Sequence, residues 1–290
     1  MTREERIMNG VKDHWADAQK NGQKPQFTLG IFLQGSQNYC LDYEDSDIDT
    51  KLIVLPTFKN IIHNDSPIST TFVRENDEHT DYKDVRLYVK NFMKQNINFL
   101  EILFTDFCIV NKRFEEDWLG LQWNREKIAH YNRFRALKAM KGMTLEKYAA
   151  LEHPYPAKVE VLDKYGFDPK QLHHILRLND FISRYTQEES FADCLIPTNP
   201  DFLIEVKKGN VYDLDRAREV AKEVVADTVE IADKFCELLP DRGDPEVDEL
   251  FDEFLCNVMK ESLSLEFSNF TVQKYIDQGI IYDFDFFSNF

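Results

Sequence analysis

Residues 32–56, FLQGSQNYCLDYEDSDIDTKLIVLP, carry a Gly-Ser pair between two apolar runs and then a cluster of acidic side chains. Five carboxylates lie close together, at Asp42, Glu44, Asp45, Asp47 and Asp49. Like charges at this spacing repel one another, so the segment is either a solvated loop or the place where a cation sits among the acids. The second apolar run, KLIVL, ends at a proline and predicts a strand directly after the acids.

Asp47 and Asp49 are the acids best placed to share a ligand. In a strand, side chains at positions i and i+2 point to the same face, about 7 Å apart, while Ile48 between them points to the core. Two carboxylates held in this way suit a hard divalent cation such as Mg²⁺, or Mn²⁺ as the alternative. The other explanation is an acidic loop that caps a strand. An EF-hand loop is excluded, because Thr50 and Pro56 stand where it needs glycine and a bidentate glutamate.

Gly35 and Ser36 follow the first apolar run and predict a phosphate site. Glycine at a strand end lets the backbone approach a ligand closely, and a hydroxyl beside the N–H groups of a helical turn favours phosphate oxygens. Ten residues separate Ser36 from Asp47, enough for a short helix and a loop that return the chain beside the first strand. The alternative role for Ser36 is a cap on that helix.

A third carboxylate completes the predicted centre, and we expect it on a neighbouring strand. Asp84 in YKDVRLY is preferred to Asp81 because it lies closer to the apolar run, with Glu101 as a further substitute. Three acids can hold two metal ions about 3.5–4 Å apart and support phosphoryl transfer. The predicted catalytic and metal-binding residues are therefore Asp47, Asp49 and Asp84.

Periodicity along the chain predicts an α+β protein. We expect a sheet-containing domain over 1–125, which bears the candidate site, and an all-helical domain over 126–290. The expected elements are a helix over 2–20, strands over 26–34, 47–56, 68–73 and 80–88, helical spacing from 89 onward, and further helices at 168–185, 214–238 and 246–264.

Composition and charge restrict the classes of partner that we expect. The 290-residue chain carries 52 acidic and 35 basic residues, a formal charge of −17 that opposes extended binding to duplex DNA but not a small anion arriving with a metal. Five widely spaced cysteines form no C-x-x-C pair and predict reduced thiols. No apolar run approaches the ~20 residues that span a bilayer, and no signal peptide is evident. We expect a cytoplasmic protein with no membrane partner.

Lys170, His174 and Arg177 share one face of the helix predicted at 168–185. Their spacing of i, i+4 and i+7 aligns them on the helix, where Lys and Arg could grip phosphate across a cleft from the metal. The alternative is a solvated helix face with salt bridges. A second basic segment, 125–143, is either an ordinary helix surface or a groove for RNA.

The pattern of Gly35-Ser36, ten residues, Asp47-Ile48-Asp49 and a later Asp84 resembles the signature of the polymerase-β-type nucleotidyltransferase superfamily. The segments DVRLYVKNFMKQNINFLEILF and YGFDPKQLHHILRL are similar to the RlaP-like predicted nucleotidyltransferases of bacteria and phages. The resemblance covers roughly residues 26–260, with its specific motifs confined to three short segments. It implies a nucleotidyltransferase-fold mixed sheet with helices, followed by helices that shape the nucleotide and acceptor pocket.

The same resemblance implies roles for the helix residues. A Lys, His and Arg recur on one helix of that group and fall on Lys170, His174 and Arg177 here, which implies that they bind nucleotide phosphates together with Gly35 and Ser36. Two positions depart from the family pattern. Thr50 replaces an apolar residue after the second Asp, and Cys40 stands where glycine is frequent.

The predicted function is metal-dependent transfer of a nucleoside monophosphate from a nucleoside triphosphate to an acceptor hydroxyl or phosphate, with release of pyrophosphate. The acceptor is left open between an RNA end, a protein and a small molecule. The alternative is a noncatalytic nucleotide-sensing or partner-binding module of the same fold, and a third candidate is an accessory protein that acts by complex formation. No P-loop, G-x-G-x-x-G or H-E-x-x-H motif competes.

Overall fold

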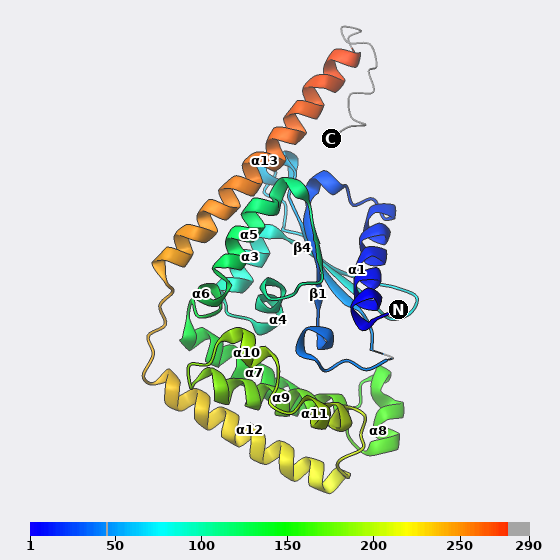
Figure 1. Ribbon diagram of the computed structural model, residues 1–290, viewed down its shortest axis with the longest axis vertical. Coiled ribbons are helices and arrows are strands. Elements are labelled where there is room, and N and C mark those ends of the chain that lie inside the picture. Colours follow the sequence, from blue (N-terminus) through cyan, green and yellow to red (C-terminus); the bar gives the residue numbers. More distant parts are fainter. Residues whose placement is uncertain (45, 278–290) are drawn as a thin grey trace.

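The computed structural model describes residues 1–44 and 46–277. Its first helix, α1 (Arg3–Lys20), begins at a Thr2 capping box in which the hydroxyl and Glu5 each accept from the other's backbone N–H. Ile7 and Val11 on its buried side pack against one face of the sheet (Figure 1). The helix expected at 2–20 is confirmed.

The sheet has five strands in the order β3-β4-β2-β1-β5. β2 and β4 run parallel and the other neighbours run antiparallel, so the sheet is mixed. The four expected strands are present, and the short β5 was not expected because three half-buried residues give no usable pattern. The strand bounds are β1 Thr28–Gln34, β2 Asp49–Val54, β3 Ser69–Val73, β4 His79–Asp84 and β5 Cys108–Val110.

The strand expected over 80–88 is wrong beyond Asp84. The chain turns there into α3 (Val85–Met93), with the Asp84 carboxylate as its N-cap. The apolar residues of α3 that are buried recur at i, i+3, i+4 and i+7, which is helical spacing; they are Val85, Tyr88, Val89 and Phe92. Their β-branched and aromatic character favours a strand locally, but burial on the sheet decides for a helix.

Helices cover the sheet face opposite α1 (Figure 1). The aromatic rings of Phe32 on β1 and Trp118 on α5 lie 4.2 Å apart between centroids, at the centre of this layer. The helices of this layer besides α3 are α4 (Ile97–Leu100) and α5 (Glu115–Trp123), whereas α2 (Phe58–Ile62) has no buried residue.

The second half of the described chain is helical, which confirms the α+β class. α9 (Pro169–Tyr185) lies at its centre, packed against α7, α11 and α12, with Asp168 as N-cap and proline at the first position. The other helices are α6 (Arg125–Ala129), α7 (Arg133–Ala150), α8 (Val159–Tyr165), α10 (Phe191–Leu195), α11 (Pro200–Lys207), α12 (Leu214–Cys236) and α13 (Pro245–Asp277).

The apolar core crosses the boundary that we expect at residue 125. α13 returns to pack on α3 and α5, where Phe92 and Phe251 stack with centroids 6.0 Å apart. Leu29 of the sheet and Phe181 of α9 belong to the same cluster of buried side chains. None of the helices among the described residues combines the length and apolarity needed to cross a membrane.

Candidate active site

A pocket of about 540 Å³ lies where the ends of β1 and β2 face α9 and α11. Seven of the eight predicted site residues line it: Gly35, Ser36, Asp47, Asp49, Lys170, His174 and Arg177. The structure thus brings together residues that lie more than 100 positions apart in the sequence.

Gly35 ends β1 in a conformation that only glycine adopts readily. Its φ of 93° and ψ of −152° leave the ordinary regions for residues with a side chain. A short 3₁₀ helix, Ser36–Tyr39, follows directly, as the spacing predicts. Gly35 is itself the N-cap and no side chain caps this turn, so the alternative role of Ser36 as a cap is wrong.

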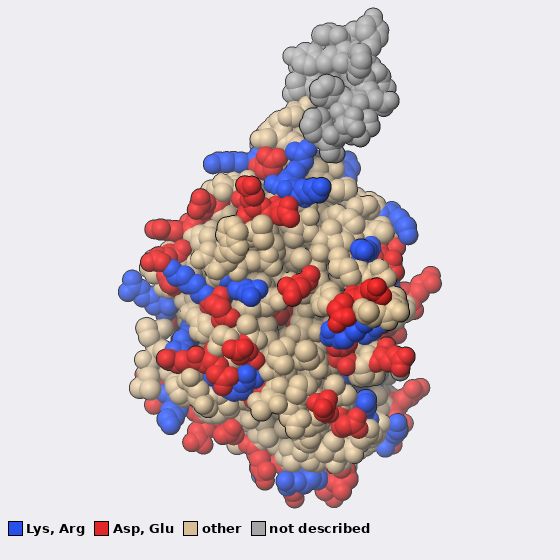
Figure 2. All heavy atoms as spheres, in the orientation of Figure 1, with Lys and Arg blue, Asp and Glu red and all other residues tan. Residues whose placement is uncertain are grey.

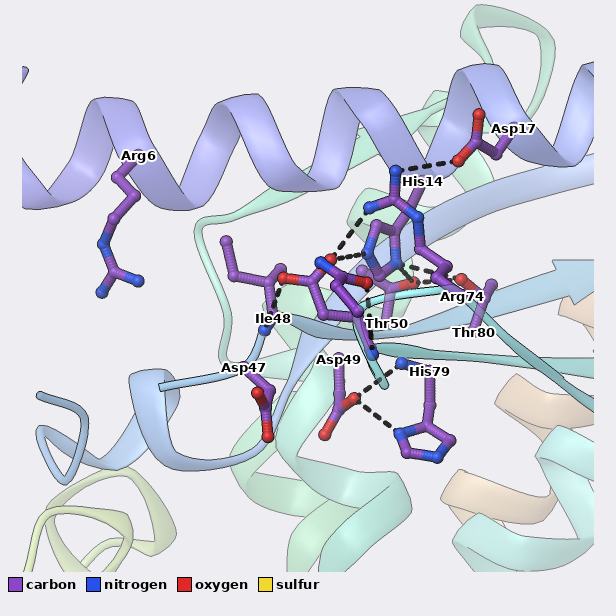
Figure 3. Close-up of polar contacts among 12 residues, drawn as sticks. Arg6, His14, Asp17, Asp47, Ile48, Asp49, Thr50, Arg74, His79 and Thr80 are labelled. Carbon is purple, nitrogen blue, oxygen red and sulfur yellow. Dashed lines mark hydrogen bonds and ion pairs between the residues drawn. The ribbon is translucent and has the colours of Figure 1, made fainter. Parts of the chain in front are cut away.

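Asp47 and Asp49 point to the same side, away from α1 (Figure 3). Asp49 begins β2 and accepts a hydrogen bond of 2.9 Å from the backbone N–H of His79. Asp47 lies just before the strand, where the Gln37 amide donates to its backbone carbonyl. Burial and then the charge of Asp49 raise the pKa of Asp47, against the opposing charge of Lys170. The two carboxylates repel one another, as the sequence suggests.

A buried polar network under the strand fixes this pair in place (Figure 3). His14 of α1 contacts the Thr50 hydroxyl at 2.8 Å and the Glu78 carboxylate at 3.0 Å. The other oxygen of Glu78 accepts from the Ile48 N–H, 3.2 Å away. Thr50, which departs from the pattern that the sequence resembles, therefore belongs to this network. The roles of His14 and Glu78 were not predicted from the sequence.

Asp84 does not join the carboxylate pair, which corrects its predicted placement. It stands opposite Val54 in the β2–β4 register, and Val54 packs on the α1 side of the sheet. Asp84 is buried, caps α3 through the Arg86 N–H, and binds the Arg86 guanidinium at 2.7 Å. The alternation of strand side chains therefore directs this acid away from the pocket.

Asp81 is the acid of β4 that reaches the pocket. It stands opposite Lys51 of β2, whose ammonium lies 3.3 Å from one of its oxygens. The Thr71 hydroxyl donates to the other oxygen at 2.6 Å. Burial acts to raise the pKa of Asp81, but the Thr71 hydrogen bond and the Lys51 charge outweigh it and lower the pKa.

The carboxylates that line the pocket could hold a single divalent ion more readily than two. Within residues 1–44 and 46–277, no three His, Cys, Asp or Glu side chains gather into a metal-binding group. Asp47 and Asp49 supply carboxylate oxygens of the kind that Mg²⁺ uses, and substrate phosphates and water normally complete its shell. The third acid, Asp81, is already engaged by Lys51 and Thr71.

Cations from two helices face these acids across the pocket. Lys170 and Arg177 come from α9, and Lys207 comes from α11. Burial and then the charge of Lys170 lower the pKa of Lys207. Burial, and next the neighbouring His173, lower the pKa of His174. The neighbouring cations favour a negatively charged ligand group, and the neighbouring acids opposite favour a positively charged one.

Among these side chains, Arg177 is notable because it is buried and has unsatisfied hydrogen-bond donors. It is only 4% exposed, yet its Nε and Nη1 have no hydrogen-bond partner among the described residues. The guanidinium lies over the Tyr39 ring, 4.2 Å from its centroid. A solvated helix face, the alternative for this motif, is wrong at Arg177, because this side chain is buried. Its two nitrogens without partners are unusual, since buried guanidinium N–H groups normally find acceptors.

Glu101, the further substitute for the third acid, lies behind the Gly35-Ser36 turn. It is buried, accepts from the Gly35 N–H at 3.2 Å and from the Tyr39 hydroxyl, and lines the pocket. Burial raises its pKa despite these hydrogen bonds. Glu101 therefore supports the loop backbone and holds the ring on which Arg177 rests.

Most cations of the basic segment 125–143 are engaged in ion pairs. Four of its cations pair with acids of the segments that follow: Lys127 with Glu246, Arg133 with Glu188, Arg135 with Asp241 and Lys141 with Asp233. On the face in Figure 2, Lys and Arg side chains are interspersed among Asp and Glu. The segment thus acts as an ordinary ion-paired helix surface.

Comparisons with known proteins give little beyond this geometry. Neither the family models nor the curated proteins compared with the chain give a match. Among solved structures, the chain is similar to the crystal structure of a nucleotidyltransferase-like protein from Exiguobacterium sibiricum 255-15, with a TM-score of 0.30 and 10% identity over 79% of this chain and 75% of that one. Similarity at this level carries no functional argument, so the function rests on the site itself.

Proposed function

We propose that the pocket binds a nucleoside triphosphate with a divalent ion and transfers its nucleoside monophosphate to an acceptor. The observation that carries this proposal is the buried guanidinium of Arg177, whose Nε and Nη1 have no hydrogen-bond partner among the described residues and which lines the pocket together with Asp47 and Asp49. An anion on one side and a cation on the other satisfy both sets of charges at once. A metal-bound polyphosphate is the common ligand of that kind.

In this proposal the basic residues bind the phosphates and the acidic residues bind the metal ion. Arg177, Lys170 and Lys207 bind phosphate oxygens, and Arg presents a planar fork suited to them. The Gly35-Ser36 turn brings backbone N–H groups close to the same phosphates. Asp47 and Asp49 would hold Mg²⁺ or Mn²⁺, which when bound offsets the charge on the transferring phosphate.

The reaction needs positioning more than covalent help from the protein. The acceptor oxygen forms a bond to the α-phosphorus, and the bond from that phosphorus to the bridging oxygen breaks, so that pyrophosphate leaves with the electron pair. The acceptor proton passes to water. Fixed charges around the triphosphate lower the barrier by holding reactants in line and offsetting charge.

A small molecule or a protein side chain is the acceptor class that the charge distribution favours. The net charge of −17 opposes long polyanions, and four of the cations at 125–143 are engaged in ion pairs. A short RNA end is the remaining candidate, because it needs little contact beyond the pocket.

A nucleotide-sensing module that binds without transfer is the second candidate function. The observation in its favour is the ion pair between Asp81 and Lys51, which removes the third carboxylate of a two-metal centre. Turnover distinguishes the two candidates, because a sensor binds nucleotide without releasing pyrophosphate.

The test is label transfer from each α-³²P nucleoside triphosphate, with Mg²⁺ or Mn²⁺ and with RNA, protein and small-molecule fractions as acceptors. We expect transfer and pyrophosphate release with the wild-type protein, and a loss of about 10³-fold in Asp47→Asn and Asp49→Asn. Glu44→Gln is the matched control, an exposed acid of the same loop, and it should keep full activity. Nucleotide binding without transfer to any of the acceptor fractions would contradict the transferase and support the nucleotide-sensing module.

A further inference from the structure

Lys51 is a buried cation on the floor of the pocket. Its side chain is 4% exposed, and it follows Asp49 by two residues on β2, so both project from the same face of the strand. A lysine is seldom buried to this degree unless its charge is matched. The position is therefore held for the ammonium group rather than for its aliphatic stem.

Two neighbours hold the ammonium. One oxygen of Asp81 lies 3.3 Å away, and the Phe99 ring centroid lies 4.6 Å away beneath it. The remaining oxygen of Asp81 accepts from Thr71 at 2.6 Å. Both carboxylate oxygens of the third acid are thus engaged by side chains of this chain.

A two-metal centre would need those same oxygens. Asp81 is the carboxylate that β4 directs into the pocket, and a second ion beside it would meet the Lys51 ammonium at close range. Like charges at such a distance in a partly buried site repel strongly. The arrangement favours one fixed protein cation over one exchangeable metal ion at this position.

We infer that the centre takes a single divalent ion, at Asp47 and Asp49, and that the ammonium of Lys51 takes the place of the second. This inference rests on the proposed function, since it concerns how many metal ions accompany the triphosphate in the pocket. Lys51 forms no covalent bond. Its ammonium supplies a positive charge beside Asp81 where a second metal would otherwise sit.

Counting bound Mn²⁺ tests the inference without turnover. The protein is saturated with a triphosphate whose α–β bridging oxygen is a methylene group, which prevents transfer, and bound Mn²⁺ is measured by electron paramagnetic resonance after equilibrium dialysis. We expect one Mn²⁺ per chain in the wild type and in Asp81→Asn, and two in Lys51→Met, where Asp81 is released. Lys51→Met combined with Asp81→Asn should return the count to one.

Lys83→Met is the matched control, because Lys83 lines the same pocket but bonds to Ser69 rather than to an acid. Its count should stay at one. Two ions in the wild type, falling to one in Asp81→Asn, would overturn the inference, and so would a folded Lys51→Met that still binds one. If Lys51→Met does not fold, the comparison of wild type with Asp81→Asn decides alone.

The outcomes for the two proposals are separable. Two bound ions together with nucleotide transfer would refute the role of Lys51 and leave the proposed function intact. One bound ion without transfer to any acceptor would refute the proposed function, while the exclusion of a second ion by Lys51 would stand.

Discussion

At the scale of single residues, the pocket is a set of charges that the protein alone leaves unbalanced. Asp47 and Asp49 repel one another on the strand side. Arg177 is buried without hydrogen-bond acceptors for two of its nitrogens on the helix side. Such an arrangement works against stability, and a ligand that carries both signs of charge relieves it. Function and stability therefore oppose one another at these positions.

Arg177→Met should have opposite effects on stability and on nucleotide binding. We expect it to raise the melting temperature, because a buried cation with unmet hydrogen bonds is replaced by an apolar side chain. Nucleotide affinity should fall by about 1.5–3 kcal/mol, the usual range for hydrogen bonds to a charged group. Thermal unfolding and calorimetric titration with the methylene analogue measure both.

Arg184→Met is the control for that variant, two turns further along α9. Arg184 is fully engaged, with Glu189 at 2.8 Å and the Ile196 carbonyl at 2.7 Å. Its replacement should lower stability and leave affinity unchanged. A less stable Arg177→Met with normal affinity would mean that Arg177 serves only to pack on Tyr39.

His173 should make stability depend on pH. It is buried, its Nδ1–H donates to the Leu203 carbonyl at 2.8 Å, and burial lowers its pKa from 6.5 to about 3. The unfolded chain binds a proton below pH 6.5 that the folded chain refuses until about pH 3, so stability is lost as pH falls through that window. The loss from this group should reach about 2 kcal/mol at pH 5.

Urea unfolding between pH 5 and 7.5 measures that loss. His173→Asn keeps a donor near Nδ1 and cannot ionise, so its stability should vary less with pH than that of the wild type. His63→Asn, at an exposed site, should follow the wild type. Equal pH dependence in all three proteins would show that His173 is not the titrating group.

At the scale of elements, the site depends on where one strand ends. The segment TDYKDVRLY predicts a strand through residue 88, but β4 stops at Asp84 and the chain becomes helical. The sequence therefore indicates the right strand, but the acid of that strand that lines the pocket is Asp81 and not Asp84. Counting alternate residues inward from Asp84 would have shown that Asp81 faces the other side.

Asp84→Ala should cost stability and not activity. The carboxylate caps α3 and binds Arg86, and the loss of a cap costs about 1 kcal/mol. Asp84→Asn retains the capping geometry and should lose less. Transfer per folded molecule should stay normal in both variants. A folded Asp84→Asn protein without transfer would restore this residue as a metal ligand.

Other parts of the site lay beyond prediction for a physical reason. The Gly-Ser turn and the Asp-x-Asp pair are local patterns, so the sequence shows them directly. Lys207 comes from a separate helix, and only the packing of α11 on α9 brings it to the pocket. The support that His14 and Glu78 give to the carboxylate pair was likewise not predictable, because buried polar partners have no characteristic spacing.

At the scale of the whole molecule, the sheet and the helices share the largest cluster of buried apolar side chains, although the pocket lies between them. Phe92 stacks on Phe251, and Leu29 of β1 belongs to the same cluster of buried side chains as Phe181 of α9. The division at residue 125 is thus a division of function that we propose rather than two separate cores.

The shared core should make unfolding cooperative. We expect a single transition in differential scanning calorimetry, with equal calorimetric and van't Hoff enthalpies. A fragment of residues 1–125 should fail to fold, since it lacks the α13 side chains that cover α3 and α5. Two separated transitions, or a folded fragment with a dispersed NMR spectrum, would contradict this view.

The most direct test of the central claim is a crystal structure with Mn²⁺ and the methylene analogue, in which anomalous scattering locates the metal. The account predicts Mn²⁺ on Asp47 and Asp49, phosphate oxygens on Arg177, and the analogue's phosphates beside Gly35 and Ser36. An analogue bound elsewhere, or bound here with no metal on the two carboxylates, would contradict it.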